Sequence, residues 1–134
     1  MLKKILEFNN VEVKLDSDLK ILDLYLTINQ GEFIFLIGKT GSGKSSILKS
    51  MYSENKIIKG EAKISDTNLR IISEKEIPYL RRKIGIIFQD FQLLSDRSVR
   101  DNLKFVMKAT GWRGKKKIDN EINNLLSKVK MLEK

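Results

Sequence analysis

The run from Gly38 to Ser45 reads Gly-Lys-Thr-Gly-Ser-Gly-Lys-Ser, which is the spacing G-x-x-x-x-G-K-[S/T], and it directly follows the apolar run 33–37. Glycines in such a loop adopt positive φ and let backbone N–H groups turn inward around phosphate oxygens, which a Cβ would obstruct. A helix that begins after the loop aims its free N–H groups and the positive end of its dipole at the same anion. The motif therefore predicts an α/β chain in which a strand delivers a phosphate-binding loop to a helix N-terminus.

The residue types in this loop point to a nucleoside triphosphate and its magnesium ion. Lys44 is predicted to reach the β- and γ-phosphates, and Ser45 is predicted to ligate Mg²⁺. We expect Lys44 to act in catalysis, because its charge offsets the negative charge that develops during phosphoryl transfer. The loop residues expected to contact the nucleotide are Gly38, Lys39, Thr40, Gly41, Ser42, Gly43, Lys44, Ser45 and Ser46.

A glycine-rich turn with a chance lysine is the alternative to a phosphate loop, and the surrounding sequence speaks against it. The apolar run before the loop has the composition of a buried strand. After the loop, Ile47, Leu48, Met51 and Tyr52 recur at spacings that share one helix face. The strand, loop and helix that the motif requires are therefore all indicated by the sequence.

The composition fits one globular domain or part of one. The chain has 134 residues, of which 41% are hydrophobic, so it can bury a core. It has no cysteine, which excludes disulfides and thiolate metal sites and makes an intracellular setting the natural expectation. No apolar run approaches the ~20 residues that span a bilayer, and the N-terminus turns polar too soon for a signal peptide. We expect a chain that is soluble by itself.

The charge is strongly positive but scattered. There are 26 Lys and Arg against 17 Asp and Glu, a formal net charge of +9. The densest run, 113–117, lies between two helical patterns and is predicted to be a solvated loop; a contact with a membrane surface or a partner remains the alternative. Only Trp112 accompanies these cations, whereas nucleic-acid grooves need several aromatic stacking surfaces, so no nucleic-acid site is predicted.

Hydrophobic periodicity predicts two kinds of strand. Residues 5–13 and 22–28 alternate apolar with polar positions, as half-buried antiparallel strands do, and 16–18 reads as the turn between them. Runs that are apolar throughout indicate central strands covered on both faces. The apolar runs are 33–37 and 84–88, and two short strands are expected at 60–65 and 68–72.

Two capping boxes and two apolar stripes predict the later helices. Ser73 and Glu76 precede one helix, in which Pro78 is tolerated only in the first turn. Ser98 and Asp101 cap another, whose apolar face holds Val99, Leu103, Val106 and Met107. A last stripe consists of Ile118, Ile122, Leu125, Leu126, Val129 and Leu132. Such a stripe normally packs against another element, so Lys134 is not expected to be a natural domain terminus.

The stretch 77–90, Ile-Pro-Tyr-Leu-Arg-Arg-Lys-Ile-Gly-Ile-Ile-Phe-Gln-Asp, resembles the approach to the Q-loop of ATP-binding-cassette (ABC) ATPases. The resemblance implies that the nucleotide is ATP and that Gln89 reaches the metal ion and the γ-phosphate. It also implies that Gln89 couples nucleotide state to a membrane partner. The continuation 91–103 is similar to the cell-division branch of that family. This similarity implies an integral membrane permease as partner, a homodimer of ATP-binding subunits, and a cytoplasmic location on the inner face of the cell membrane.

The resemblance also implies how the chain is organised. Residues 1–88 match the nucleotide-binding core, which is expected to be an α/β domain with a mixed sheet and an N-terminal antiparallel β layer. Residues 89–97 match the Q-loop region, and 98–134 match the start of the helical subdomain. The family's signature sequence, its second nucleotide motif and its switch histidine are expected beyond Lys134. The chain alone is therefore expected to bind nucleotide with little or no turnover.

Two positions depart from the family's pattern. The aromatic residue that stacks on adenine in the family should fall near Leu15, which offers apolar contact without a π face. Lys39 stands where these subunits often have proline, and it is either a second cation beside the phosphates or a solvated loop lysine.

Three alternatives to the cell-division branch stay open. One is the ATPase subunit of a lipoprotein-release or small-molecule transporter, which shares most of these residues. Another is a small phosphotransferase with the same loop, which the Q-loop stretch and the N-terminal strands disfavour. The last is a non-catalytic module that docks a partner through 89–102.

Overall fold

The computed structural model describes residues 3–15 and 20–132. The chain divides into two compact units, one through Gly85 and one from Ile86. The turn predicted at 16–18 lies outside the described residues. The two units are described separately below.

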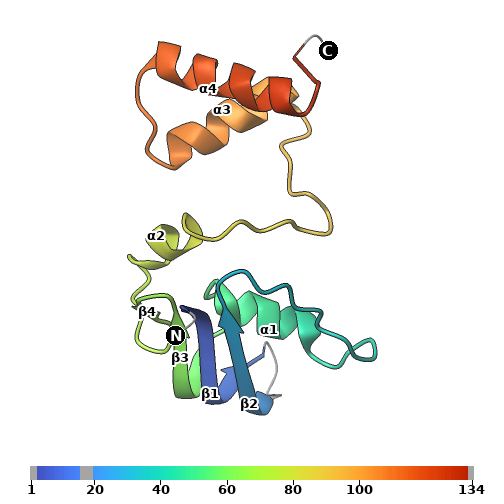
Figure 1. Cartoon of the computed structure of the whole chain (residues 1–134), viewed down its shortest axis with the longest axis vertical. Helices are drawn as coiled ribbons and strands as arrows, with labels where there is room; N and C mark the ends of the chain where they lie inside the picture. The colour runs from blue at the N-terminus through green and yellow to red at the C-terminus, as the bar shows by residue number, and fades with distance from the viewer. Residues whose placement is uncertain (1–2, 16–19, 133–134) are drawn as a thin grey trace. The chain divides into compact units, whose positions relative to one another are not determined.

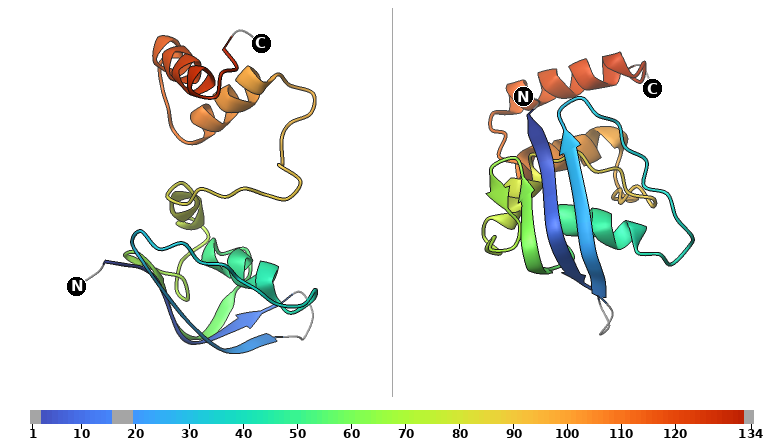
Figure 2. Two further views of the ribbon diagram at one scale, coloured as in Figure 1. Left: turned by 45° about the vertical axis from the view of Figure 1, so that its right-hand side comes forward. Right: turned by 60° about the horizontal axis from the view of Figure 1, so that its bottom comes forward.

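The first unit is a four-stranded antiparallel sheet with the strand order β2-β1-β3-β4. Its strands are β1 (Lys4–Lys14), β2 (Lys20–Asn29), β3 (Ile57–Ile64) and β4 (Thr67–Asn68). Helix α1 (Lys44–Met51) lies across one face of this sheet (Figures 1 and 2). The antiparallel layer predicted from the alternation in 5–13 and 22–28 is therefore confirmed, with each strand slightly longer than expected.

Strand β1 contains a bulge that the simple alternation does not show. The buried positions change from even to odd numbers along the strand, from Leu6 and Phe8 to Val11 and Val13. The pairing with both neighbouring strands shifts in this interval, and Asn10 has a φ of 52°. The extra residue of a bulge shifts the alternation of side chains along the strand by one position. Both apolar pairs therefore point into the same core.

The core of the first unit lies between the sheet and the segments that cover it. Met51 of α1 packs against this cluster, as do Leu15 and Ile21 from the strand ends. Its buried members are Leu6, Phe8, Val11, Val13, Ile57, Ala62, Leu69 and Leu80. The short helix α2 (Ile77–Arg81) contributes the last of them.

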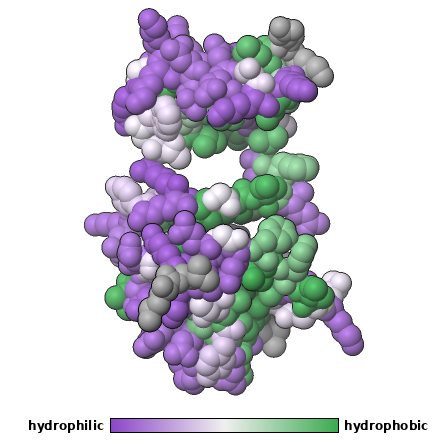
Figure 3. All heavy atoms as spheres, viewed as in Figure 1, coloured by the Kyte–Doolittle hydropathy of each residue, from purple (hydrophilic) through white to green (hydrophobic). Residues whose placement is uncertain are grey.

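The two runs that are apolar throughout are not strands in this structure. Residues 33–37 and 84–88 have no ladder partner in the described part of the chain, and every described pairing is antiparallel. Phe33, Phe35 and Ile37 are 81%, 75% and 89% exposed, and green patches reach the surface of the first unit in Figure 3. Apolar composition alone does not make a strand, because a strand exists only where neighbours complete its backbone hydrogen bonds.

Two smaller predictions also need correction. The strand expected at 68–72 is limited to β4, which pairs with the end of β3 and then gives way to turns. Near α2, Glu76 rather than Ser73 is the residue before the helix, although its carboxylate accepts hydrogen bonds from the Ser73 N–H at 2.9 Å and from Ser73 Oγ at 2.6 Å. Pro78 lies in the first turn, as predicted.

The second unit is a hairpin of two helices, α3 (Val99–Ala109) and α4 (Lys115–Lys128). Their shared core consists of Met107, Ile118, Ile122 and Leu126, with Leu103 and Trp112 at its edge. The apolar stripes predicted from the sequence therefore include the residues that pack, although Val99, Val106, Leu125, Val129 and Leu132 of those stripes are exposed.

The two helices of the hairpin begin in different ways. Ser98 caps α3 as predicted, because Ser98 Oγ accepts from the Asp101 N–H at 3.1 Å and donates to Asp101 Oδ2 at 2.7 Å. The run 113–117 is only partly the loop that was predicted: 115–117 form the first turn of α4, which has neither a side-chain cap nor an acidic residue. Among the described residues, no helix is long and apolar enough to cross a bilayer.

Candidate phosphate-binding loop

Two of the three glycines in the loop before α1 have the positive φ that the motif predicts, and Gly38 does not. Gly41 and Gly43 have φ values of 81° and 90°, in the left-handed region that glycine adopts without strain. Gly43 is the N-cap of α1. The sequence thus turns from an extended segment into a helix within the glycines of the motif.

Two other contacts explain why the loop needs glycine. A Cβ on Gly38 would lie 2.8 Å from Ser42 Oγ, which means that the first and fifth residues of the loop are almost in contact. A Cβ on Gly43 would lie 3.0 Å from Cδ1 of Ile21 on β2. The loop is therefore closed on itself and seated against the sheet.

The ammonium group of Lys44 lies inside the loop. It donates hydrogen bonds to the carbonyl oxygens of Gly38 at 2.8 Å and of Lys39 at 2.7 Å, and it lies 3.4 Å from Ser42 Oγ. A cation held by carbonyl dipoles can exchange those partners for phosphate oxygens, which bind it more strongly because they are charged. The lysine is thus placed at the anion site that the loop predicts.

The N-terminus of α1 is open toward this site. No side chain caps it, and its first turn carries no acidic residue that would occupy its N–H groups. Ser45 is exposed, while Ser46 is half-buried and its carbonyl accepts from Asn55 Nδ2 at 3.3 Å. Within the helix, the hydroxyl of the buried Ser50 donates a 2.7 Å hydrogen bond to the Ile47 carbonyl. The N–H groups of the first turn are therefore not occupied by a side-chain cap.

Of the remaining candidate residues, two lie on the loop and two lie apart from it in the sequence. Lys39 and Thr40 are exposed on it, whereas Leu15 follows β1 and is half-buried against the core of the first unit. Gln89 is exposed and belongs to the second unit. The described contacts bring together Gly38, Lys39, Ser42 and Lys44, and they do not include Gln89 or Leu15.

The turn that carries Gln89 has an uncommon backbone. The next residues, Phe91 and Gln92, have φ values of 57° and 45°, and neither is glycine. Two hydrogen bonds hold this turn: the Phe91 N–H donates to the Phe88 carbonyl at 3.1 Å and the Gln92 N–H to the Asp90 carbonyl at 2.7 Å. Consecutive left-handed residues of this kind store strain, which is typical of functional loops.

Sequence reasoning missed the residue that orders the segment after this turn. Asn102 of α3 accepts a hydrogen bond from the Leu94 N–H at 2.9 Å and donates to the Leu94 carbonyl at 3.0 Å. Its Nδ2 also donates to the carbonyls of Arg97 at 3.3 Å and Ser98 at 3.1 Å. A polar residue one turn into a helix, close after a loop, was the available signal.

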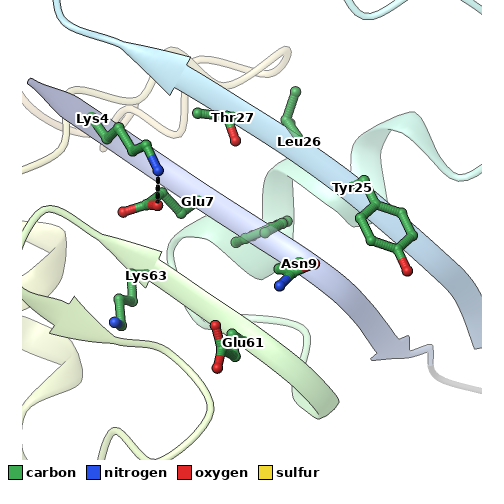
Figure 4. A pocket seen from close by; sticks show the side chains of 9 residues that line it. Lys4, Glu7, Asn9, Tyr25, Leu26, Thr27, Glu61 and Lys63 are labelled. Carbon is green, nitrogen blue, oxygen red and sulfur yellow. Dashed lines mark hydrogen bonds and ion pairs between the residues drawn. The ribbon is translucent and has the colours of Figure 1, made fainter. Parts of the chain in front are cut away.

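A second hollow lies on the sheet, away from the phosphate loop. Figure 4 shows its side chains on β1, β2 and β3, with Lys4 and Glu7 joined by a 2.7 Å ion pair. It has a volume of about 390 Å³, and Glu61 and Lys63 add one charge of each sign. Its charges are therefore balanced, unlike those of the phosphate loop.

Relatives of known sequence cover most of this chain. The profile of the ABC transporter family matches residues 21–134. The cell division ATP-binding protein FtsE of Bacillus subtilis is 40% identical over 108 residues, which are 80% of this chain and 47% of that protein. The methionine import ATP-binding protein MetN of Legionella pneumophila is 33% identical over 130 residues, 97% of this chain and 38% of that protein.

Solved structures show the same fold. CbiO1 of Clostridium perfringens, part of an ABC transporter complex, superposes with a TM-score of 0.79 at 25% identity, over 96% of this chain and 51% of that one. The chain spans about half the length of the curated relatives it matches. The α/β fold of an ABC ATP-binding domain, predicted from the sequence, is confirmed for the part that the chain covers. The chain belongs to the ABC transporter family.

Proposed function

We propose that the chain is the nucleotide-binding part of an ABC ATPase subunit, which binds ATP with Mg²⁺ at the loop 38–45. The observation that carries the proposal is the ammonium group of Lys44, held inside a closed glycine loop at the open N-terminus of α1. Cation, backbone N–H groups and helix dipole all favour an anion at this point.

The loop residues would act on the phosphates as follows. Lys44 would leave the carbonyls of Gly38 and Lys39 and pair with the β- and γ-phosphate oxygens. Backbone N–H groups of 39–46 would surround the phosphates, and Lys39 would add a second cation. The small residues at Gly38, Gly41 and Gly43 leave the room that this cradle requires.

The metal ion and the reaction would depend on two further residues. The exposed hydroxyl of Ser45 would hold Mg²⁺, and Gln89 would contribute a second contact to the ion and the γ-phosphate. Bound Mg²⁺ supplies charge neutralisation on the β- and γ-oxygens. Lys44 would hold the same oxygens in place, so that water can attack the γ-phosphorus in line while the bond to the bridging oxygen breaks and ADP leaves. Leu15 would offer the adenine an apolar contact.

The wider role follows from the relatives. Those named cell division ATP-binding protein FtsE support a role in cell division. In that role the subunit would work as a homodimer with an FtsX-like permease, on the cytoplasmic face of the cell membrane. In this assignment, residues 1–88 are the nucleotide-binding core, 89–97 are the Q-loop region and 98–134 begin the helical subdomain. The strained turn after Gln89 suits a segment that reports the state of the nucleotide to the permease.

Calorimetric titration with ATP and Mg²⁺ tests the nucleotide site. Lys44→Ala should abolish binding, because it removes the cation inside the loop. Lys49→Ala is the matched control, since it removes the other lysine of α1, whose partner is Glu54 at 2.7 Å. Equal affinity in the wild-type chain and in Lys44→Ala would reject the assignment of the loop.

A transporter subunit is the second candidate, and the MetN relatives favour it. The two roles differ in the permease that the subunit contacts. Affinity purification of the complete subunit from membranes, followed by identification of the bound permease, separates them. An FtsX-like permease supports cell division, and a permease of a small-molecule transporter supports import.

A further inference from the structure

Cations gather at one end of the α3–α4 hairpin. Between Lys104 and Glu121 the sequence has six Lys and Arg residues and two carboxylates. The six, called the basic end below, are Lys104, Lys108, Arg113, Lys115, Lys116 and Lys117. In the described part of the chain, none of these six forms an ion pair with a carboxylate. Like charges held together without counter-ions repel one another, so the basic end favours a polyanionic surface.

The cations of the basic end line two hollows. Trp112 lines both of them. The first has a volume of about 340 Å³, and its lining residues include no carboxylate: Lys104, Lys108, Trp112, Arg113, Gly114, Lys115 and Ile118. The second is more open and is lined by 115–117 with Glu121 at its margin. In Figure 3 hydrophilic side chains dominate the visible face of this hairpin.

Trp112 gives the basic end an amphipathic centre. The ring packs against the buried cluster of the hairpin on one side and remains half-exposed. Lys117 Nζ lies 5.2 Å from the centroid of this ring. Tryptophan beside lysines is typical of surfaces at the membrane–water interface, where the ring lies among headgroups and the ammonium groups reach lipid phosphates.

We propose that the basic end docks on a bilayer surface that contains anionic phospholipids, with lipid phosphates between its lysines and Trp112 at headgroup depth. Juxtamembrane clusters of four to eight Lys and Arg have this property through charge attraction alone. A nucleic acid fits less well, because Trp112 is the only aromatic residue among the lining residues of the two hollows. The proposal goes beyond nucleotide binding and does not depend on it, since all its residues lie in the second unit.

Co-sedimentation of the 134-residue chain with vesicles tests the proposal. Phosphatidylcholine vesicles with phosphatidylglycerol should bind the chain, and vesicles of phosphatidylcholine alone should not. The variant Lys115→Gln, Lys116→Gln, Lys117→Gln should lower the partition coefficient on the order of 100-fold, at about fivefold per charge. The fluorescence of Trp112, the only tryptophan, should shift to shorter wavelength on binding.

A matched variant separates this site from the overall charge of +9. Lys56→Gln, Lys63→Gln, Lys75→Gln removes the same charge from exposed positions of the first unit, and it should lower binding much less. If the α4 variant fails to fold by circular dichroism, Lys104→Gln, Lys108→Gln tests the same hollow from α3.

Four results would overturn the proposal. The first is a loss of vesicle binding in the matched variant as large as that in the α4 variant, and the second is equal binding to vesicles without phosphatidylglycerol. The third is displacement of the chain from vesicles by inorganic phosphate at constant ionic strength. The fourth is tighter binding to a uridine oligonucleotide than to vesicles, with the same dependence on the lysines. The third would assign a free-phosphate site and the fourth a nucleic-acid site.

Discussion

The side chain of Asn102 pairs with the backbone of Leu94 as a neighbouring strand would, accepting from its N–H at 2.9 Å and donating to its carbonyl at 3.0 Å. The segment that follows the Gln89 turn is thus fixed to α3 by one carboxamide. Because a carboxamide has both a donor and an acceptor, neither aspartate nor a hydrophobic residue can replace both bonds.

Asn102→Ala should therefore loosen the segment 94–98. We expect the free energy of unfolding to fall by about 1–3 kcal/mol, since half-buried backbone groups lose their partners. Amide exchange of Leu94 should accelerate in the native state. Asn123→Ala is the control: Asn123 accepts only an exposed bond from Arg100 at 2.8 Å, so this change should be nearly neutral. Unchanged exchange of Leu94 in Asn102→Ala would contradict the role of the carboxamide.

Gly60→Ala should lower the free energy of unfolding more than Gly31→Ala. Gly60 has a φ of 84°, and a Cβ there would lie 2.6 Å from the Asn10 carbonyl carbon and 2.7 Å from the Asn9 carbonyl oxygen. Gly31 has nearly the same φ, 85°, but open space around its Cβ position. Gly31→Ala should cost about 1 kcal/mol for the backbone conformation alone, and Gly60→Ala clearly more. Urea unfolding of both variants measures the two losses in the free energy of unfolding. Equal losses would mean that the backbone of the bulge moves away from the added Cβ without cost.

Leu15→Tyr should tighten the binding of ATP by roughly 0.5–1.5 kcal/mol, the range for an added aromatic stacking pair. The gain is expected because a tyrosine ring has a π face that stacks on the base, and leucine has none. Calorimetry with ATP and GTP measures the gain and its base preference, with Leu22→Tyr on exposed β2 as the control. If neither nucleotide binds more tightly, residue 15 is not at the base.

The 134-residue chain should hydrolyse ATP negligibly at any protein concentration, although we expect it to bind the nucleotide. In-line attack needs a positioned water and charge compensation from several groups at once, and the first unit contributes the cradle, Lys44 and Ser45. A version extended to the length of its relatives should gain activity as it dimerises. Steady-state phosphate release measures both. Robust turnover by residues 1–134 that is lost in Lys44→Ala would show that the site is already complete.

The local features of the fold were predictable because they depend on near neighbours in the sequence. The loop 38–45, the cap formed by Ser98 and Asp101, and the packed face of α4 all follow from spacing over a few residues. The charge of 115–117 suggested a loop, yet these residues are helical, because the packing of Ile118 and Ile122 sets the start of α4. Tertiary burial thus outweighed the unfavourable placement of cations at a helix N-terminus.

Features that depend on distant partners were not predictable. To predict the bulge at Asn10, one must know that Phe8 and Val11 face the same core. The change from even-numbered to odd-numbered apolar positions between them is the sign of it in the sequence. The runs 33–37 and 84–88 were expected to be strands from composition, but a ladder needs a neighbour at the right distance. Gln89 was identified only by family resemblance, since an exposed glutamine in a turn has no local signature.

The exposed run 33–37 sets a limit on how this chain behaves in concentrated solution. Phe33 and Phe35 pack edge to face with ring centroids 4.9 Å apart, so the segment is already extended with a flat apolar side. Uncharged apolar residues with free backbone groups form a template on which an identical segment can add as a strand. Glu32 and Lys39 stand on either side of it as charged gatekeepers, with Glu32 fixed by a 2.7 Å bond from the Asn29 N–H. The same run that delivers the phosphate loop is therefore the place where intermolecular β-sheet, and with it aggregation, would begin.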